Sequence, residues 1–200
     1  MKLESVIYAV AGVFFGLIAG WIIGSQQASM APRPGAPAAA SAPPPSSSGA
    51  VPGTPAPAIL DEAQVQALRN VVDRDPKNAV ARAQLGNLYY DAGRYSDAIK
   101  WYGESIAINP NDVSVSTDLG VSYYYSNQPD LAIKQLEHSL QIDPTHTKTL
   151  LNMGVVRAFG KQDLKGATEV WRRLVEIAPE SQEGRQARQA LESLASAHPQ

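Results

Sequence analysis

A repeat of 34 residues runs through the second half of this chain of 200 residues. Glycines recur at that spacing and prolines recur with them, the last proline following after 35 residues: Gly86, Gly120 and Gly154, with Pro76, Pro110, Pro144 and Pro179. A unit of this length cannot bury its hydrophobic face alone, so neighbouring units must stack to share one continuous core. The spacing therefore predicts a stacked array of similar units.

Several other positions agree in register across three units. The units read Leu85-Gly86, Tyr89, Ala98, Tyr102, Pro110; then Leu119-Gly120, Tyr123, Ala132, Leu136, Pro144; then Met153-Gly154, Ala167, Trp171, Pro179. These residues resemble the tetratricopeptide repeat pattern W-x2-L-G-x2-Y, A-x3-F and P, from Ala79 to Pro179. The leading Trp of the pattern is replaced in the three units by Arg82, Ser116 and Leu150, and the Tyr of the third unit is replaced by Arg157. The third unit also has one residue inserted in its inter-helix turn.

The resemblance implies an all-α fold, an α–α superhelix of eight helices. The expected segments are three repeats at about 79–112, 113–146 and 147–180, an N-terminal capping helix at 59–77 and a C-terminal capping helix at 181–196. Terminal caps are needed because an open end would expose the stacked core. We expect Asn78, Asp112 and Thr147 to cap the first helices of the repeats, because short polar side chains accept hydrogen bonds from free backbone N–H groups there.

Residues 1–24 are predicted to form a transmembrane helix. Val6 to Ile23 carries no charge, and its 18 residues rise about 27 Å as a helix, close to the hydrocarbon thickness of a bilayer. The alternative is a cleaved signal peptide with a site at Ser29-Met30-Ala31, although the apolar run is long for one. Lys2 and the amino terminus lie before the span, so the positive-inside rule favours a cytoplasmic N-terminus.

Four glycines lie on one side of this predicted helix: Gly12, Gly16, Gly20 and Gly24. They share a side because a step of four residues advances only about 40° around the axis. Small residues let helix backbones approach closely in lipid, where packing drives association. The pattern predicts a homo-oligomer formed through the transmembrane helix. The alternative is that glycine is simply common in membrane helices.

Residues 25–58 contain nine prolines and a single charge, Arg33. Such a segment has too few large apolar side chains to bury, so it predicts a disordered Pro/Ala/Ser-rich linker. A proline-rich ligand for an aromatic groove is the alternative, but no basic pattern flanks the prolines.

The composition excludes several classes of function. The chain has no Cys, which excludes disulfides, thiol nucleophiles and Cys-based metal or haem sites. Its net charge of -2 argues against a nucleic-acid partner, which would require a basic patch. His138, His146 and His198 are isolated, so no metal site is expected. No catalytic or cofactor-binding constellation is evident, and the chain is not expected to be an enzyme.

Tetratricopeptide arrays bind peptides in a concave groove lined by the first helix of each repeat. By register, the resemblance implies that the groove presents Asn87, Tyr90, Asp91, Thr117, Val121, Tyr124, Tyr125, Lys148, Leu151, Asn152 and Val155. Tyrosine is both aromatic and polar, a composition enriched at interfaces. One subclass clamps a C-terminal carboxylate with a Lys/Asn/Asn/Lys/Arg set. Only Asn87 and Lys148 match that set, and Asp118 would repel a carboxylate.

These features predict a single-pass membrane protein that recruits a protein or peptide partner through its repeats. The third unit, from Gly160 to Leu174, is similar to the repeats of bacterial cytochrome c biogenesis factors. That similarity implies a bacterial inner-membrane protein with its repeats on the periplasmic side. Two alternatives remain open, a cytochrome c biogenesis-type assembly factor and a structural protein that assembles through its glycine face.

Overall fold

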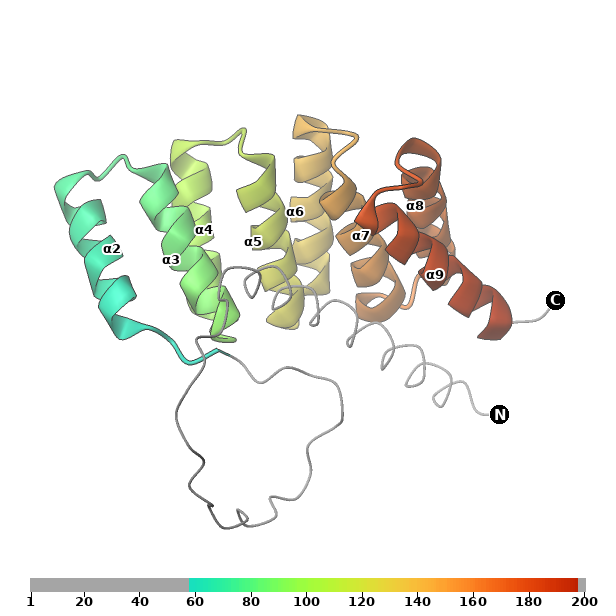
Figure 1. Cartoon of the computed structure of the whole chain (residues 1–200), viewed down its shortest axis with the longest axis horizontal. Helices are drawn as coiled ribbons and strands as arrows, with labels where there is room; N and C mark the ends of the chain where they lie inside the picture. The colour runs from blue at the N-terminus through green and yellow to red at the C-terminus, as the bar shows by residue number, and fades with distance from the viewer. Residues whose placement is uncertain (1–57, 198–200) are drawn as a thin grey trace, which may run out of the picture. The chain divides into compact units, whose positions relative to one another are not determined.

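The computed structural model describes residues 58–197, and this part of the chain is helical throughout, without a strand (Figure 1). Its elements are α2 (Glu62–Arg74), α3 (Ala79–Asp91), α4 (Tyr95–Ile108), α5 (Val113–Tyr125), α6 (Pro129–Ile142), α7 (Thr147–Val155), the π-helical turn η2 (Val156–Gly160), α8 (Leu164–Ile177) and α9 (Gln182–Ala197). The eight α-helices confirm the all-α superhelix predicted for this region. The predicted transmembrane helix, its glycine face and the linker up to Pro57 lie outside the described residues. Within these residues, no helix combines the length and the apolarity that a membrane crossing requires.

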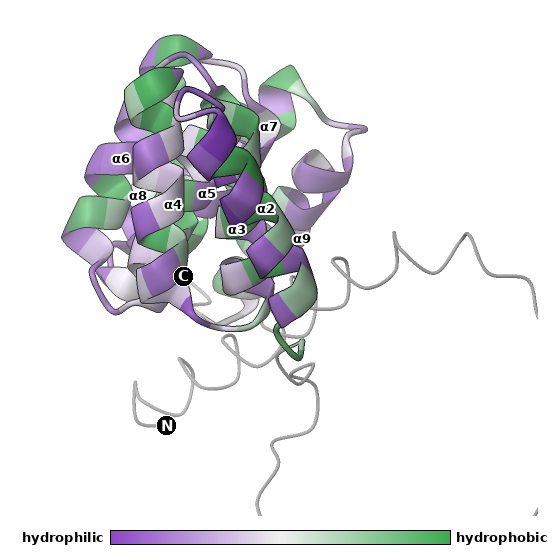
Figure 2. Cartoon of the chain, turned by 90° about the vertical axis from the view of Figure 1, so that its left-hand side faces the viewer, coloured by the Kyte–Doolittle hydropathy of each residue, from purple (hydrophilic) through white to green (hydrophobic). Residues whose placement is uncertain are grey.

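The helices follow one another in chain order, so that each packs against its neighbours in sequence (Figure 1). We call the first helix of each repeat helix A (α3, α5, α7) and the second helix B (α4, α6, α8). Short turns join A to B, which makes each pair an antiparallel hairpin. Hydrophilic and hydrophobic residues are mixed along each helix (Figure 2), as expected for helices with one buried face.

The repeat glycines allow the two helices of each pair to lie close together. Each glycine faces one large side chain of helix B: Gly86 faces Tyr102, Gly120 faces Leu136 and Gly154 faces Trp171. A Cβ at Gly86 or Gly154 would overlap the aromatic ring, and a Cβ at Gly120 would lie 2.9 Å from Leu136 Cγ. The 34-residue spacing of the glycines therefore follows from close packing against helix B.

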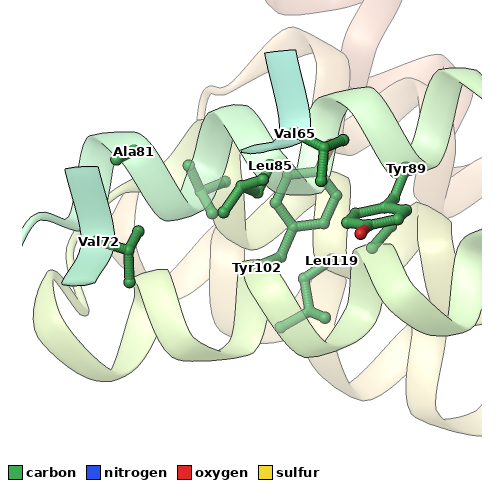
Figure 3. Packing of buried hydrophobic residues seen from close by; sticks show 9 residues of the cluster. Val65, Val72, Ala81, Leu85, Tyr89, Tyr102 and Leu119 are labelled. Atoms are coloured by element: carbon green, nitrogen blue, oxygen red, sulfur yellow. The ribbon is translucent and has the colours of Figure 1, made fainter. Parts of the chain in front are cut away.

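The first part of the core joins α2 to the first repeat (Figure 3). Its largest members are Val65 from α2, Leu85 and Tyr89 from α3, Tyr102 from α4 and Leu119 from α5. Arg69 of α2 also donates a hydrogen bond to the Tyr89 hydroxyl at 2.8 Å. Helix α2 thus covers one end of the stacked core, as a terminal helix of a repeat array must.

Two of the three predicted helix caps are present. The side chains of Asn78 and Asp112 accept hydrogen bonds from the backbone N–H three residues later, at 2.9 and 3.1 Å. The prediction for Thr147 is wrong, because Thr147 is the first helical residue and His146 precedes it as the N-cap. The third repeat keeps the register of 34, which places residue 146 at the capping position. The imidazole makes no capping bond, and its Nδ1 lies 2.7 Å from Thr149 Oγ1 instead.

The turns between helices A and B require a left-handed residue. Gly93, Asn127 and Gln162 hold this position with φ values of 70, 59 and 56°. In the first two repeats a backbone hydrogen bond closes the turn over five residues, as in a Schellman motif. In the third, Asp163 N donates to Arg157 O six residues back, at 2.8 Å. The inserted residue predicted from the sequence is thus accommodated by the π-helical turn η2.

Candidate partner-binding surface

Side-chain contacts join the A helices of successive repeats. Tyr90 of α3 meets Tyr125 of α5, with ring centroids 6.0 Å apart. Asp118 of α5 pairs with Lys148 of α7, with 2.7 Å between Oδ1 and Nζ. These contacts gather residues from all three repeats into what we call the A-helix surface: Asn87, Tyr90, Asp91, Tyr95, Asp118, Tyr125, Lys148 and Asn152.

Four half-buried rings form a tyrosine cluster at this surface: Tyr90, Tyr95, Tyr124 and Tyr125. Tyr95 stacks on Tyr125, with centroids 4.9 Å apart and planes inclined by 18°. Tyr90 meets Tyr95 edge-on at 5.4 Å. The cluster presents ring edges and faces together with hydroxyl groups, so it can contact a partner through both apolar and polar atoms.

The hydroxyl groups of the cluster stay protonated over a wide pH range. Burial raises the pKa of Tyr125 to about 12, helped by Tyr95 and Tyr124 and opposed by a hydrogen bond with Tyr90. Burial also raises the pKa of Tyr90, with Tyr125, Tyr95 and Asp118 adding to the effect. Each hydroxyl therefore remains both a donor and an acceptor at neutral pH.

Polar groups adjoin the cluster on α3. Asn87 Oδ1 accepts a hydrogen bond from the Tyr102 hydroxyl at 2.7 Å, which leaves the exposed amide nitrogen of Asn87 as a donor to a ligand. Asp91, one turn further along, is exposed and has no ion-pair partner among the described residues. Partial burial, followed by repulsion from Asp118, raises the pKa of the Asp91 carboxyl.

Four of the residues predicted to line a groove are largely buried. The prediction that Thr117 faces a groove is wrong, because its side chain has no exposed surface and its Oγ1 lies 2.6 Å from Thr149 Oγ1 of α7. Val121, Leu151 and Val155 each expose less than a tenth of their surface. Side chains as buried as these offer a partner little contact area.

The remaining predicted residues differ in their surroundings. The Tyr124 ring lies close to Gly160 of η2 in the next repeat, and Pro129 of α6 borders the same glycine. Asn152 is half-buried and donates a hydrogen bond to Lys148 O at 2.8 Å. The A-helix register could not include Tyr95, because this residue begins helix B of the first repeat. One sequence signal could have indicated that Tyr95 belongs to this surface: Tyr90 and Tyr95 lie on either side of the turn at Gly93, so the turn brings the two rings near each other.

The two residues that match the carboxylate clamp both contact other side chains of this chain. Lys148, which matches one position of the clamp, is held by Asp118 at 2.7 Å. Asn87, the other matching residue, turns its oxygen toward Tyr102.

Within residues 58–197, no three His, Asp or Glu side chains lie close enough together to hold a metal ion.

The stacked antiparallel helix pairs define a helical-repeat protein. A family model described as TPR repeat matches residues 86–126, and one described as tetratricopeptide repeat matches residues 114–146. The matched stretch, residues 86–146, therefore resembles tetratricopeptide repeats.

Solved structures with the same fold include MamA, with a TM-score of 0.56 at 18% identity over 66% of this chain and 81% of MamA. MamA 41-end from Desulfovibrio magneticus RS-1 gives 0.56 at 21% identity, covering 60% and 68% of the two chains. The first TPR of Spaghetti (RPAP3), solved bound to the HSP90 peptide SRMEEVD, gives 0.53 at 24% identity, covering 60% and 96%. At these identities the likeness shows the fold alone. No curated protein sequence matches this chain.

Proposed function

We propose that this chain is a membrane-anchored adaptor whose tetratricopeptide repeats hold a peptide segment of a partner protein on the A-helix surface. The tyrosine cluster is the observation that carries the proposal. Tyr90 of the cluster lies in α3, one turn after the exposed Asn87 and directly before the exposed Asp91, and such a mixture of aromatic and polar groups suits the centre of a binding interface. The peptide bound to the first TPR of Spaghetti gives support from a protein of the same fold.

The membrane part of the proposal rests on the sequence. The uncharged run from Val6 to Ile23 would anchor the chain, the segment 25–58 would space the repeats from the bilayer, and the repeats would lie on the periplasmic side of a bacterial inner membrane. Gly12, Gly16, Gly20 and Gly24 would pair two such anchors. The cytochrome c biogenesis role and the purely structural role stay predictions.

Site-specific photocrosslinking in cells tests the partner surface. A photoreactive phenylalanine derivative in place of Asn87 should capture one defined protein, and mass spectrometry should locate the crosslink within a single peptide segment. The matched control places the same group at Lys134, which is exposed on helix B of the second repeat. Equal capture at both positions, or capture at neither, would contradict the adaptor proposal.

Membrane extraction tests the anchor separately. The full chain should stay in the membrane fraction after alkaline carbonate washing, and a variant that lacks residues 1–24 should be released. External protease should degrade the repeats in spheroplasts if they face the periplasm. Release of the full chain by carbonate would contradict the anchor without affecting the partner surface.

A further inference from the structure

We propose that the A-helix surface selects a positively charged partner segment, with an arginine side chain placed between the tyrosine cluster and the carboxylate of Asp91. This inference rests on the proposed function and names the chemistry of the partner. Three observations carry it: the state of the charges on the surface, the geometry of the rings, and the imbalance of charge along the array.

The charges of the A-helix surface leave one carboxylate without a counterion. Asp118 is satisfied by Lys148 at 2.7 Å, but Asp91 forms no ion pair with any described residue. Arg94, only three residues away, is held by Asp97 at 2.7 Å, and its guanidinium lies over the Tyr89 ring. The two carboxylates and the single ammonium group therefore leave the surface with a net charge of -1.

Asp91 is also placed so that an added cation would gain more than at an ordinary surface carboxylate. Partial burial and the neighbouring Asp118 raise the pKa of Asp91, so both effects disfavour its charged form in the absence of a ligand. A cation brought to this position relieves the repulsion between the two carboxylates.

The rings of the cluster favour a planar cation. Tyr95 and Tyr125 are nearly parallel, and Tyr90 meets Tyr95 at 68°, so the cluster offers both flat and edge surfaces. A guanidinium stacks on aromatic faces and binds a carboxylate through two parallel N–H donors, whereas an ammonium group can do only part of this. The same contact already occurs within the molecule, where the guanidinium carbon of Arg94 lies 4.8 Å from the centroid of Tyr89.

Charge along the array reinforces this preference. Residues 59–147, which include the first two repeats, carry twelve acidic and seven basic side chains, a net charge of -5. Residues 148–188 carry five acidic and eight basic side chains, a net charge of +3. The field around the tyrosine cluster therefore attracts cations during approach and repels an acidic segment.

Peptide selection on the full chain tests the inference. The full chain in detergent micelles is immobilised and used to select from a phage-displayed library of random dodecapeptides. We expect the selected sequences to be enriched in Arg, and to a lesser degree in Lys, relative to the starting library. Selection of neutral or acidic peptides would overturn the inference while leaving the proposed function intact. Failure to select any peptide would overturn both.

Substitution of the unpaired carboxylate locates the preference. Asp91→Asn should weaken binding of a selected Arg peptide by about tenfold, and replacing that Arg by Gln in the peptide should abolish the effect of the substitution. Asp73→Asn is the matched control, because Asp73 is an exposed carboxylate on α2 without an ion pair among the described residues. Thermal melting should show the same fold in both variants. Equal loss in the two variants would assign the effect to overall charge and overturn the proposed position.

Discussion

Gly154 lies directly against the indole ring of Trp171, and Trp171 Nε1 donates a hydrogen bond to Leu151 O at 3.2 Å. The two helices of the third repeat are thus joined by packing and by a hydrogen bond at the same place. The equivalent helix B positions hold the smaller Tyr102 and Leu136. The third repeat therefore depends most strongly on the absence of a side chain at its glycine.

Gly154→Ala should destabilise the domain by about 1–3 kcal/mol, because the added methyl group forces the buried indole out of place. Gly103→Ala is a matched control, since nothing lies within 4 Å of a Cβ added at that helical position. It should stabilise the domain by about 0.5–1 kcal/mol through higher helix propensity. Urea unfolding followed by circular dichroism measures both, and equal effects would contradict the packing argument.

The left-handed turn residues differ in their tolerance of this backbone conformation. Gln162 has a φ of 56°, which is strained for a residue with a side chain. Gly93 holds the equivalent turn position in the first repeat, where glycine adopts a positive φ at no steric cost. Gln162→Gly should therefore stabilise the domain by about 0.5–1 kcal/mol, and Gly93→Gln should destabilise it by about 1 kcal/mol. Thermal melting of the two variants gives the signs directly. Destabilisation by Gln162→Gly would show that the side chain contributes more than its backbone strain.

A buried pair of hydroxyls joins the two helices of the second repeat. Ser116 and Ser139 have no exposed surface, and their Oγ atoms lie 2.7 Å apart. Either serine replaced by Ala should cost about 1–2 kcal/mol, because Gln135 or the remaining hydroxyl loses a partner. The double variant should lose less than the sum of the single variants, by about 0.5–1.5 kcal/mol. Strict additivity in a double-mutant cycle would argue against the hydrogen bond.

The tyrosine cluster should make stability sensitive to alkaline pH. The pKa of Tyr125 is raised to about 12, so in the folded state it keeps a proton that an unfolded tyrosine releases near pH 10. Its stabilising contribution is complete below about pH 10 and is lost as the pH rises toward 12. Urea midpoints should fall across this interval, and Tyr125→Phe should reduce the fall. An unchanged slope in that variant would be contrary to this account.

Much of the fold could be predicted from the spacing of a few residues. The glycines and prolines fixed the length and register of the repeats, because the glycines have to be small where helix B crosses and the prolines cannot continue a helix. Asn78 and Asp112 were recognisable as caps for the same local reason. The prediction of Thr147 as a cap was wrong because threonine is the better capping residue by type, whereas the 34-residue register places His146 at the capping position.

The candidate surface could be predicted from the sequence only in part. Register identified Tyr90 and Tyr125 as members of the A helices, but their contact with Tyr95 depends on how one repeat stacks on the next. The burial of Thr117 has the same origin, since its partner from the next repeat, Thr149, lies in the neighbouring α7. Patterns within one repeat predict which side of a helix faces the core, whereas contacts between repeats depend on the rotation from one unit to the next.

The hydroxyl pair of Thr117 and Thr149 has a consequence for recognition. Hydrogen bonds are directional, so a contact of 2.6 Å between α5 and α7 fixes their relative position more narrowly than apolar packing would. The distance from the tyrosine cluster to Asn152 is thereby set before a ligand arrives. A peptide that spans both repeats would meet a receptor that gives up little conformational freedom on binding, and more of the contact energy would remain as affinity.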